Sequence, residues 1–144
     1  MEWVYAILSF IGGIGLAFQS SINAELGKKM GTLEVALLAY SVGTLMLLVM
    51  TIFLGKGDIG LGLTFPKWKL LAGVMGALFI FIMTTVIPNI GVAPAVSAAI
   101  MGQMFLGMIL DHFGLFGSPA IPINLYRLAG LMLMFVSIFL FYKK

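Results

Sequence analysis

The chain has 144 residues, of which 62% are hydrophobic and only 9% are charged. Soluble domains carry about 25% charged residues, so this chain has too little charge to cover a water-facing surface. Its net charge of +3 comes from Lys and Arg residues that are scattered over predicted loops and helix ends, unlike the basic patch of a nucleic-acid-binding protein. The composition therefore predicts an integral membrane protein that binds no nucleic acid.

Five segments are long and apolar enough to cross a membrane as helices, which takes about 20 residues each. The segment from Leu70 to Leu110 has no Asp, Glu, Lys or Arg, and it is about twice too long for one crossing. We expect it to fold back around Gly91, with Pro88 ending one helix and Pro94 in the first turn of the next. The predicted spans, in a single transmembrane domain 1–144, are residues 3–26, 33–55, 67–87, 94–112 and 124–142.

Lys and Arg residues are divided equally between the two predicted membrane faces. The face of the N-terminus carries Lys56, Lys67, Lys69 and Arg127, and the opposite face carries Lys28, Lys29, Lys143 and Lys144. An excess of these residues on the cytoplasmic side normally sets orientation, so the chain is predicted to insert both ways up. Two opposite copies would form an antiparallel homodimer, which supplies the inverted repeat of many secondary transporters. The alternative is a chance balance, with a local feature such as Lys28-Lys29 fixing the orientation.

The first span places small and polar residues along one helical face. Gly12, Gly15, Gln19 and Asn23 follow one another at spacings of three or four residues, and Ser20 lies beside them. Glycines let a ligand or another helix approach the backbone, while amides both donate and accept hydrogen bonds. This face is therefore a candidate binding surface.

The fourth span carries a further amide near its middle. Gln103 shares a face with Ala95 and Ala99, and Ser97 lies beside that face. Because an amide in contact with lipid is costly, we expect Gln103 to point inward. The predicted substrate-binding residues are Gln19, Asn23, Gln103, Ser20 and Ser97. The alternative is that they bond neighbouring helices or a second subunit, contributing roughly 0.6–2 kcal/mol each.

Other polar residues have simpler expected roles. The hydroxyls of the second and third spans are expected to bond their own helix backbone; they are Ser41, Thr44, Thr84 and Thr85. Arg127 is expected to extend outward from its span, and Asp111-His112 to lie at the membrane interface. Glu25 is a candidate proton-linked carboxylate if its helix end is buried in the dimer, and a solvated partner of Lys28 or Lys29 otherwise.

The residue inventory argues against enzymatic chemistry. One His and no Cys leave no nucleophile–base arrangement, and the carboxylates are not clustered as metal ligands. We therefore expect no enzyme, no cofactor and no metal site.

Three stretches of the sequence together resemble one family of membrane proteins. They are Gln19–Gly27 (QSSINAELG), Ala39–Leu45 (AYSVGTL), and Gly102-Gln103 with Asp111–Gly114 (DHFG). They are similar to the YdcZ-type family, a five-helix branch of the drug/metabolite transporter superfamily. This resemblance implies a multi-pass protein of the prokaryotic inner membrane, encoded singly with dual topology, as oppositely oriented pairs, or as fused ten-helix chains. It implies alternating access but no substrate, and the central acidic residue of small multidrug pumps has no counterpart here.

The combined prediction is an all-α membrane protein with five transmembrane helices per chain. Two antiparallel copies would form a ten-helix inverted-repeat bundle that transports a small organic solute across the lipid. Two alternatives remain open. One is an amphiphile or lipid flippase whose cleft opens to the membrane, and the other is a membrane scaffold subunit that transports nothing.

Overall fold

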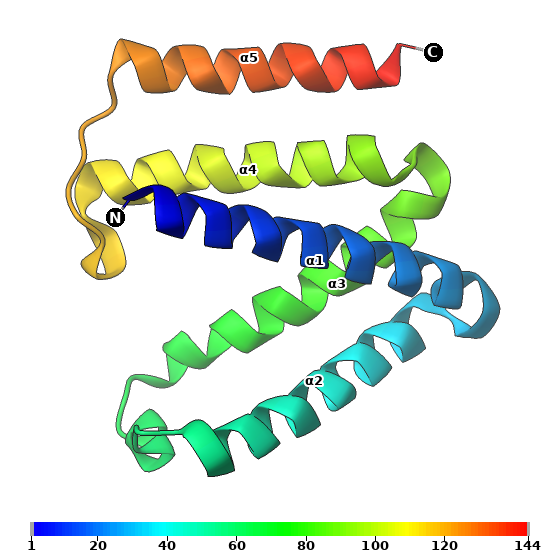
Figure 1. Ribbon diagram of the computed structural model, residues 1–144, viewed down its shortest axis with the longest axis vertical. Helices are drawn as coiled ribbons and strands as arrows, with labels where there is room; N and C mark the ends of the chain where they lie inside the picture. Colours follow the sequence, from blue (N-terminus) through cyan, green and yellow to red (C-terminus); the bar gives the residue numbers. More distant parts are fainter. Residues whose placement is uncertain (1, 144) are drawn as a thin grey trace. The chain divides into compact units, whose positions relative to one another are not determined.

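A computed structural model describes residues 2–143 of the chain. The described residues form five long α-helices, α1 (Glu2–Met30), α2 (Thr32–Leu54), α3 (Leu71–Ile90), α4 (Val92–Phe113) and α5 (Leu125–Tyr142) (Figure 1). Short 3-10 turns, η1 (Ile59–Leu63), η2 (Lys67–Leu70) and η3 (Leu115–Gly117), lie in the two longer connections. Each of five segments, with η2 and α3 counted as one, is long and apolar enough to cross a membrane. The predicted all-helical, five-span architecture is confirmed.

Single glycines separate the helices at two of the junctions. Gly31 lies between α1 and α2 with φ +100°, and Gly91 lies between α3 and α4 with φ +91°. Glycine adopts this conformation without the steric penalty of a side chain. Pro94 lies in the first turn of α4, as predicted.

The prediction that Pro88 ends a helix was wrong. Pro88 lies inside α3, which continues to Ile90. Proline removes one backbone donor, and membrane helices tolerate this where other groups compensate. The side-chain Nδ2 of Asn89 donates to the Thr85 carbonyl at 2.7 Å, which adds a hydrogen bond within this last turn. The glycine, and not the proline, marks the end of the helix.

The chain divides into two compact units, residues 2–89 and residues 90–143. In the first unit, α1 packs along α2. The buried residues of this unit gather toward the α1–α2 turn and the last turns of α3; they are Ser20, Asn23, Ala24, Val35, Ala36, Met83, Thr84 and Ile87. In the second unit, α4 packs along α5 and against η3.

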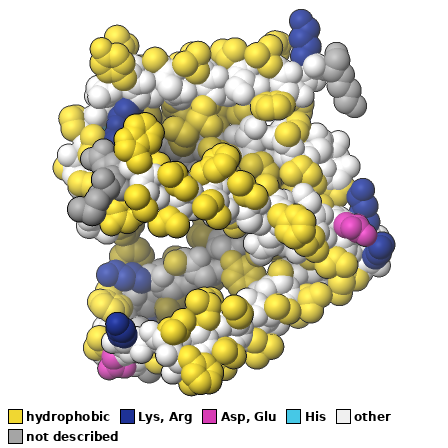
Figure 2. Space-filling model, in the orientation of Figure 1, with side chains coloured by type: hydrophobic (Ala, Val, Ile, Leu, Met, Phe, Trp, Pro, Cys, Tyr) yellow, Lys and Arg dark blue, Asp and Glu magenta, His cyan; other side chains and the backbone are white. Residues whose placement is uncertain are grey.

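Most large apolar side chains of the described helices are exposed. Figure 2 shows hydrophobic side chains over most of the visible face, while the charged side chains lie toward helix ends and connections. A surface of this kind is suited to lipid. Lys144, which completes the predicted charge balance, lies outside the described residues.

Candidate functional site

A pocket of about 400 Å³ lies in the first unit, between α1, α2 and α3. Its polar lining residues are Gln19, Ser20, Asn23, Tyr40, Thr44 and Thr84. Its apolar lining residues are Leu16, Ala39, Leu47, Phe79, Ile80 and Met83, and glycines line it at positions 43 and 76. The volume falls within the range of sites that hold small molecules.

Each helix contributes one stripe of residues to this pocket. The α1 residues are Leu16, Gln19, Ser20 and Asn23, at spacings of three and four that place them on one face. The lining residues of α2 (39, 40, 43, 44 and 47) and of α3 (76, 79, 80, 83 and 84) follow the same pattern. The pocket therefore arises where three helical stripes face one another, and it includes three of the predicted site residues, Gln19, Ser20 and Asn23.

Two glycines permit close contact among the three helices. A Cβ atom on Gly27 of α1 would lie 2.5 Å from Cγ2 of Thr84 on α3, too close for two carbon atoms. A Cβ atom on Gly76 of α3 would overlap the hydroxyl of Tyr40 on α2. The absence of side chains at these positions lets α3 approach α1 and α2, and Gly76 itself lines the pocket.

Hydroxyl groups near the pocket divide into two classes by their hydrogen bonds. Those of Ser41 and Thr85 donate to the carbonyl four residues earlier, at 2.8 and 2.9 Å, as predicted. Thr44 and Thr84 were predicted to do the same, and for both the prediction was wrong: neither hydroxyl bonds to any described residue. The Thr84 side chain is only 1% exposed, so its Oγ1 is a buried polar atom without a partner.

The amides of the predicted site are also without protein partners. Neither Gln19 nor Asn23 makes a side-chain hydrogen bond within residues 2–143, and the same holds for the Ser20 hydroxyl. Asn23 and Ser20 are buried, at 7% and 9% exposure, whereas Gln19 is exposed. Buried polar groups in proteins are nearly always hydrogen-bonded, so this set of groups is suited to bind a polar ligand.

The remaining predicted site residues lie elsewhere. Gln103 and Ser97 are on α4, in the second unit, and they are not in the lining of this pocket. Gln103 is exposed and Ser97 is half-buried. Their predicted part in substrate binding, and the inward direction of Gln103, stay predictions.

Glu25 occupies an exposed position near the end of α1. Its side chain is 71% exposed, and its Oε1 accepts a hydrogen bond from Lys29 Nζ at 3.1 Å. This geometry favours the alternative of a solvated helix end over the role of a buried, proton-linked carboxylate.

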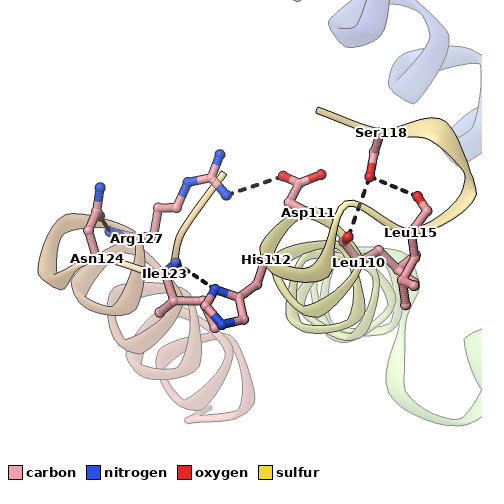
Figure 3. Close-up of polar contacts among 8 residues, drawn as sticks. All are labelled: Leu110, Asp111, His112, Leu115, Ser118, Ile123, Asn124 and Arg127. Atoms are coloured by element: carbon pink, nitrogen blue, oxygen red, sulfur yellow. Dashed lines mark hydrogen bonds and ion pairs between the residues drawn. The ribbon is translucent and has the colours of Figure 1, made fainter. Parts of the chain in front are cut away.

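A second polar cluster joins the end of α4 to the start of α5 (Figure 3). Arg127 Nη1 donates to Asp111 Oδ2 at 3.2 Å, and the backbone N–H of Ile123 donates to His112 Nδ1 at 3.3 Å. Asn124 caps α5 by accepting from the Arg127 backbone at 2.9 Å. Arg127 thus pairs with Asp111, and its predicted outward direction in the membrane stays a prediction. The predicted spans place both residues near the same membrane face, and nothing else in the sequence indicated this ion pair.

Comparisons with known proteins agree with this architecture. The family model described as "Putative inner membrane exporter, YdcZ" matches residues 4–140. The chain is 27% identical over 110 residues to "Inner membrane protein YdcZ" of Escherichia coli (strain K12), covering 74% of each chain. No solved structure matches the chain significantly.

The family and the five membrane-length helices together identify a multi-pass protein of the inner membrane. At a general level they support a membrane transporter, because the family is described as a putative exporter. Because the family model covers nearly the whole sequence, the chain belongs to the YdcZ family, as the resemblance of its motifs indicated.

Proposed function

We propose that this protein is a secondary transporter of small organic solutes, with the pocket between α1, α2 and α3 as its substrate site. One observation carries the proposal: Gln19, Ser20, Asn23, Thr44 and Thr84 line a common cavity and make no hydrogen bond to described residues. A scaffold subunit would use such groups in helix–helix bonds. Polar groups without hydrogen-bond partners among the described residues are instead available to a ligand that binds reversibly.

The depth of the pocket supports a transport site. Thr44 is close to the middle of α2, and Ile80 is close to the middle of α3. Secondary transporters bind their substrates near the membrane midplane, where the site can open to either side in turn. A pocket at this depth therefore fits alternating access.

The proposed working unit is an antiparallel homodimer. The equal division of Lys and Arg between the faces leaves orientation undetermined. Gly12 and Gly15 lie on the Gln19 face of α1, and a Cβ atom at either would meet no neighbouring atom. Glycines on an open face allow close approach of another membrane helix. The second copy would pack here and cover the exposed Gln19.

Solute flux in proteoliposomes tests the proposed function. A panel of small organic solutes is first screened for flux, and the flux of the best solute is then measured in variants. We expect Gln19→Leu and Asn23→Leu to abolish flux while crosslinking still yields the dimer. The same result is expected for Gln103→Leu if α4 contributes to the site. Ser21→Ala is the matched control, because the Ser21 hydroxyl bonds the Ala17 carbonyl at 2.9 Å and does not line the pocket. Full flux in both Gln19→Leu and Asn23→Leu would contradict the proposal.

A further inference from the structure

We infer that the substrate is an electrically neutral amphiphile, with its hydrogen-bonding end toward the α1–α2 turn and its apolar body at the other end of the pocket. This inference rests on the proposed function, because it assigns a substrate class to the same site. It follows from the charge, the burial and the order of the lining residues.

The pocket offers no charge to a bound molecule. None of its described lining residues is Asp, Glu, Lys, Arg or His. The acidic residues closest to it in sequence are Glu25, which is exposed and paired with Lys29, and Glu34, which is exposed in the first turn of α2. A substrate charge that lost its hydration here would meet no opposite charge among the described lining residues, which disfavours binding. A neutral substrate avoids this cost.

One end of the pocket is suited to hydrogen bonding. Ser20 and Asn23 are buried on α1, and Thr84 is buried near the end of α3. The amide both donates and accepts, as do the two hydroxyls. The Thr84 Oγ1 has no partner among the described residues, and a buried polar atom in this state is destabilising until a ligand atom satisfies it. A hydroxyl, ether or amide of the substrate fits this end.

The opposite end of the pocket is lined mainly by apolar side chains, with the hydroxyl of Tyr40 lying against Gly76 there. Leu16 precedes Asn23 by two helical turns, which is about 10 Å along the axis. Because α2 returns from the turn at Gly31, Leu47 is farther from that turn than the other lining residues of α2. Phe79, five positions before Thr84, adds an aromatic side chain. The buried polar groups thus gather at one end of the site, which suits an elongated molecule with one hydrogen-bonding end and a mainly apolar body.

Two probe molecules of the same shape, one neutral and one cationic, test the effect of substrate charge alone. The neutral probe is para-tert-butylbenzyl alcohol, and the cationic probe is para-(trimethylammonio)benzyl alcohol, in which one nitrogen replaces one carbon. Binding to the full-length protein in nanodiscs is measured by calorimetry, with empty nanodiscs as the reference for lipid partitioning. We expect the wild type to bind the neutral probe about tenfold more tightly or better, because the cation finds no counter-charge.

Variants of pocket residues test whether the preference for the neutral probe arises in the pocket. Gln19→Glu replaces an amide by a carboxylate of the same shape, and it should reverse the preference in favour of the cation. Thr84→Val removes only the buried hydroxyl and should weaken binding of the neutral probe severalfold. Ser41→Ala is the control, since the Ser41 hydroxyl bonds its own helix and lies outside the lining. Thermal unfolding of each variant is measured first, to show that the variant is folded before its probe binding is measured.

The outcomes distinguish the substrate class from the function itself. Equal or tighter binding of the cation by the wild type would overturn the neutral class. If Asn23→Leu then abolished that binding, the pocket would still be the site, because cation–π attraction to Tyr40 or Phe79 could supply it. Absence of saturable binding by either probe would overturn the substrate class for molecules of this shape. The flux experiment, which does not use these probes, decides the proposed function separately.

Discussion

The guanidinium of Arg127, in the first turn of α5, donates to the carboxylate of Asp111, near the end of α4, at 3.2 Å. The two side chains are 29% and 34% exposed. The Asp111 backbone carbonyl also accepts from the Ile121 N–H at 2.9 Å. The Asp111–Arg127 ion pair and this backbone bond therefore both fasten the end of α4 to the segment that leads into α5.

Breaking the Asp111–Arg127 pair should destabilise the second unit. Asp111→Asn or Arg127→Gln is expected to lower the free energy of unfolding by about 1 kcal/mol, the upper range for partly exposed ion pairs. A double-mutant cycle in detergent, followed by circular dichroism, measures the coupling between the two side chains. The exchange Asp111→Arg with Arg127→Asp is the control, because it keeps the number of cations on that membrane face. Zero coupling energy would show that the pair has no part in stability.

The buried hydroxyl of Thr84 should act in binding and not in stability. Thr84→Val keeps the side-chain shape and replaces a hydroxyl that has no partner among the described residues. We therefore expect the free energy of unfolding to stay unchanged or to rise by up to about 1 kcal/mol. Solute flux should fall in the same variant. Thr85→Val is the matched control, because that hydroxyl bonds the Phe81 carbonyl; flux should be retained there. A clear loss of stability in Thr84→Val would assign the hydroxyl a structural role instead.

The contact between Gly27 and Thr84 should be intolerant of one added methyl group. Gly27→Ala places a Cβ atom 2.5 Å from Thr84 Cγ2, and such overpacking costs about 1–3 kcal/mol. Adding Thr84→Ser removes Cγ2 and should restore most of the lost stability. Gly73→Ala on α3 is the control, since a Cβ atom there meets nothing. Unfolding in denaturing detergent ranks the four proteins, and equal stability of Gly27→Ala and Gly73→Ala would refute this contact.

Dual insertion predicts a defined response to added charge. Several Lys residues attached after the C-terminus should hold that end in the cytoplasm and reduce transport, because only one orientation would then form. Co-expression with a copy biased the opposite way should restore transport. Compartment-specific labelling of a C-terminal cysteine measures the orientations, and the unmodified chain should label from both sides. Labelling from one side alone would rule out the antiparallel homodimer.

Local sequence patterns were sufficient for part of the candidate site. The spacing of Gln19 and Asn23 placed them on one face of α1, and the structure brings both into one pocket. Thr84 and Thr85 are neighbours of the same type, and no local pattern assigns them different roles. Only the tertiary structure shows that Thr84 lines the pocket and that its hydroxyl has no partner among the described residues.

The sequence by itself determined the membrane class, the five spans and the family. These properties depend on composition and on periodicities within single helices, which the chain carries wherever its helices lie. The tertiary structure decided that the polar stripes of α1, α2 and α3 face a common pocket and that Arg127 pairs with Asp111. Those relationships depend on distances between atoms of different helices, and no local pattern encodes them.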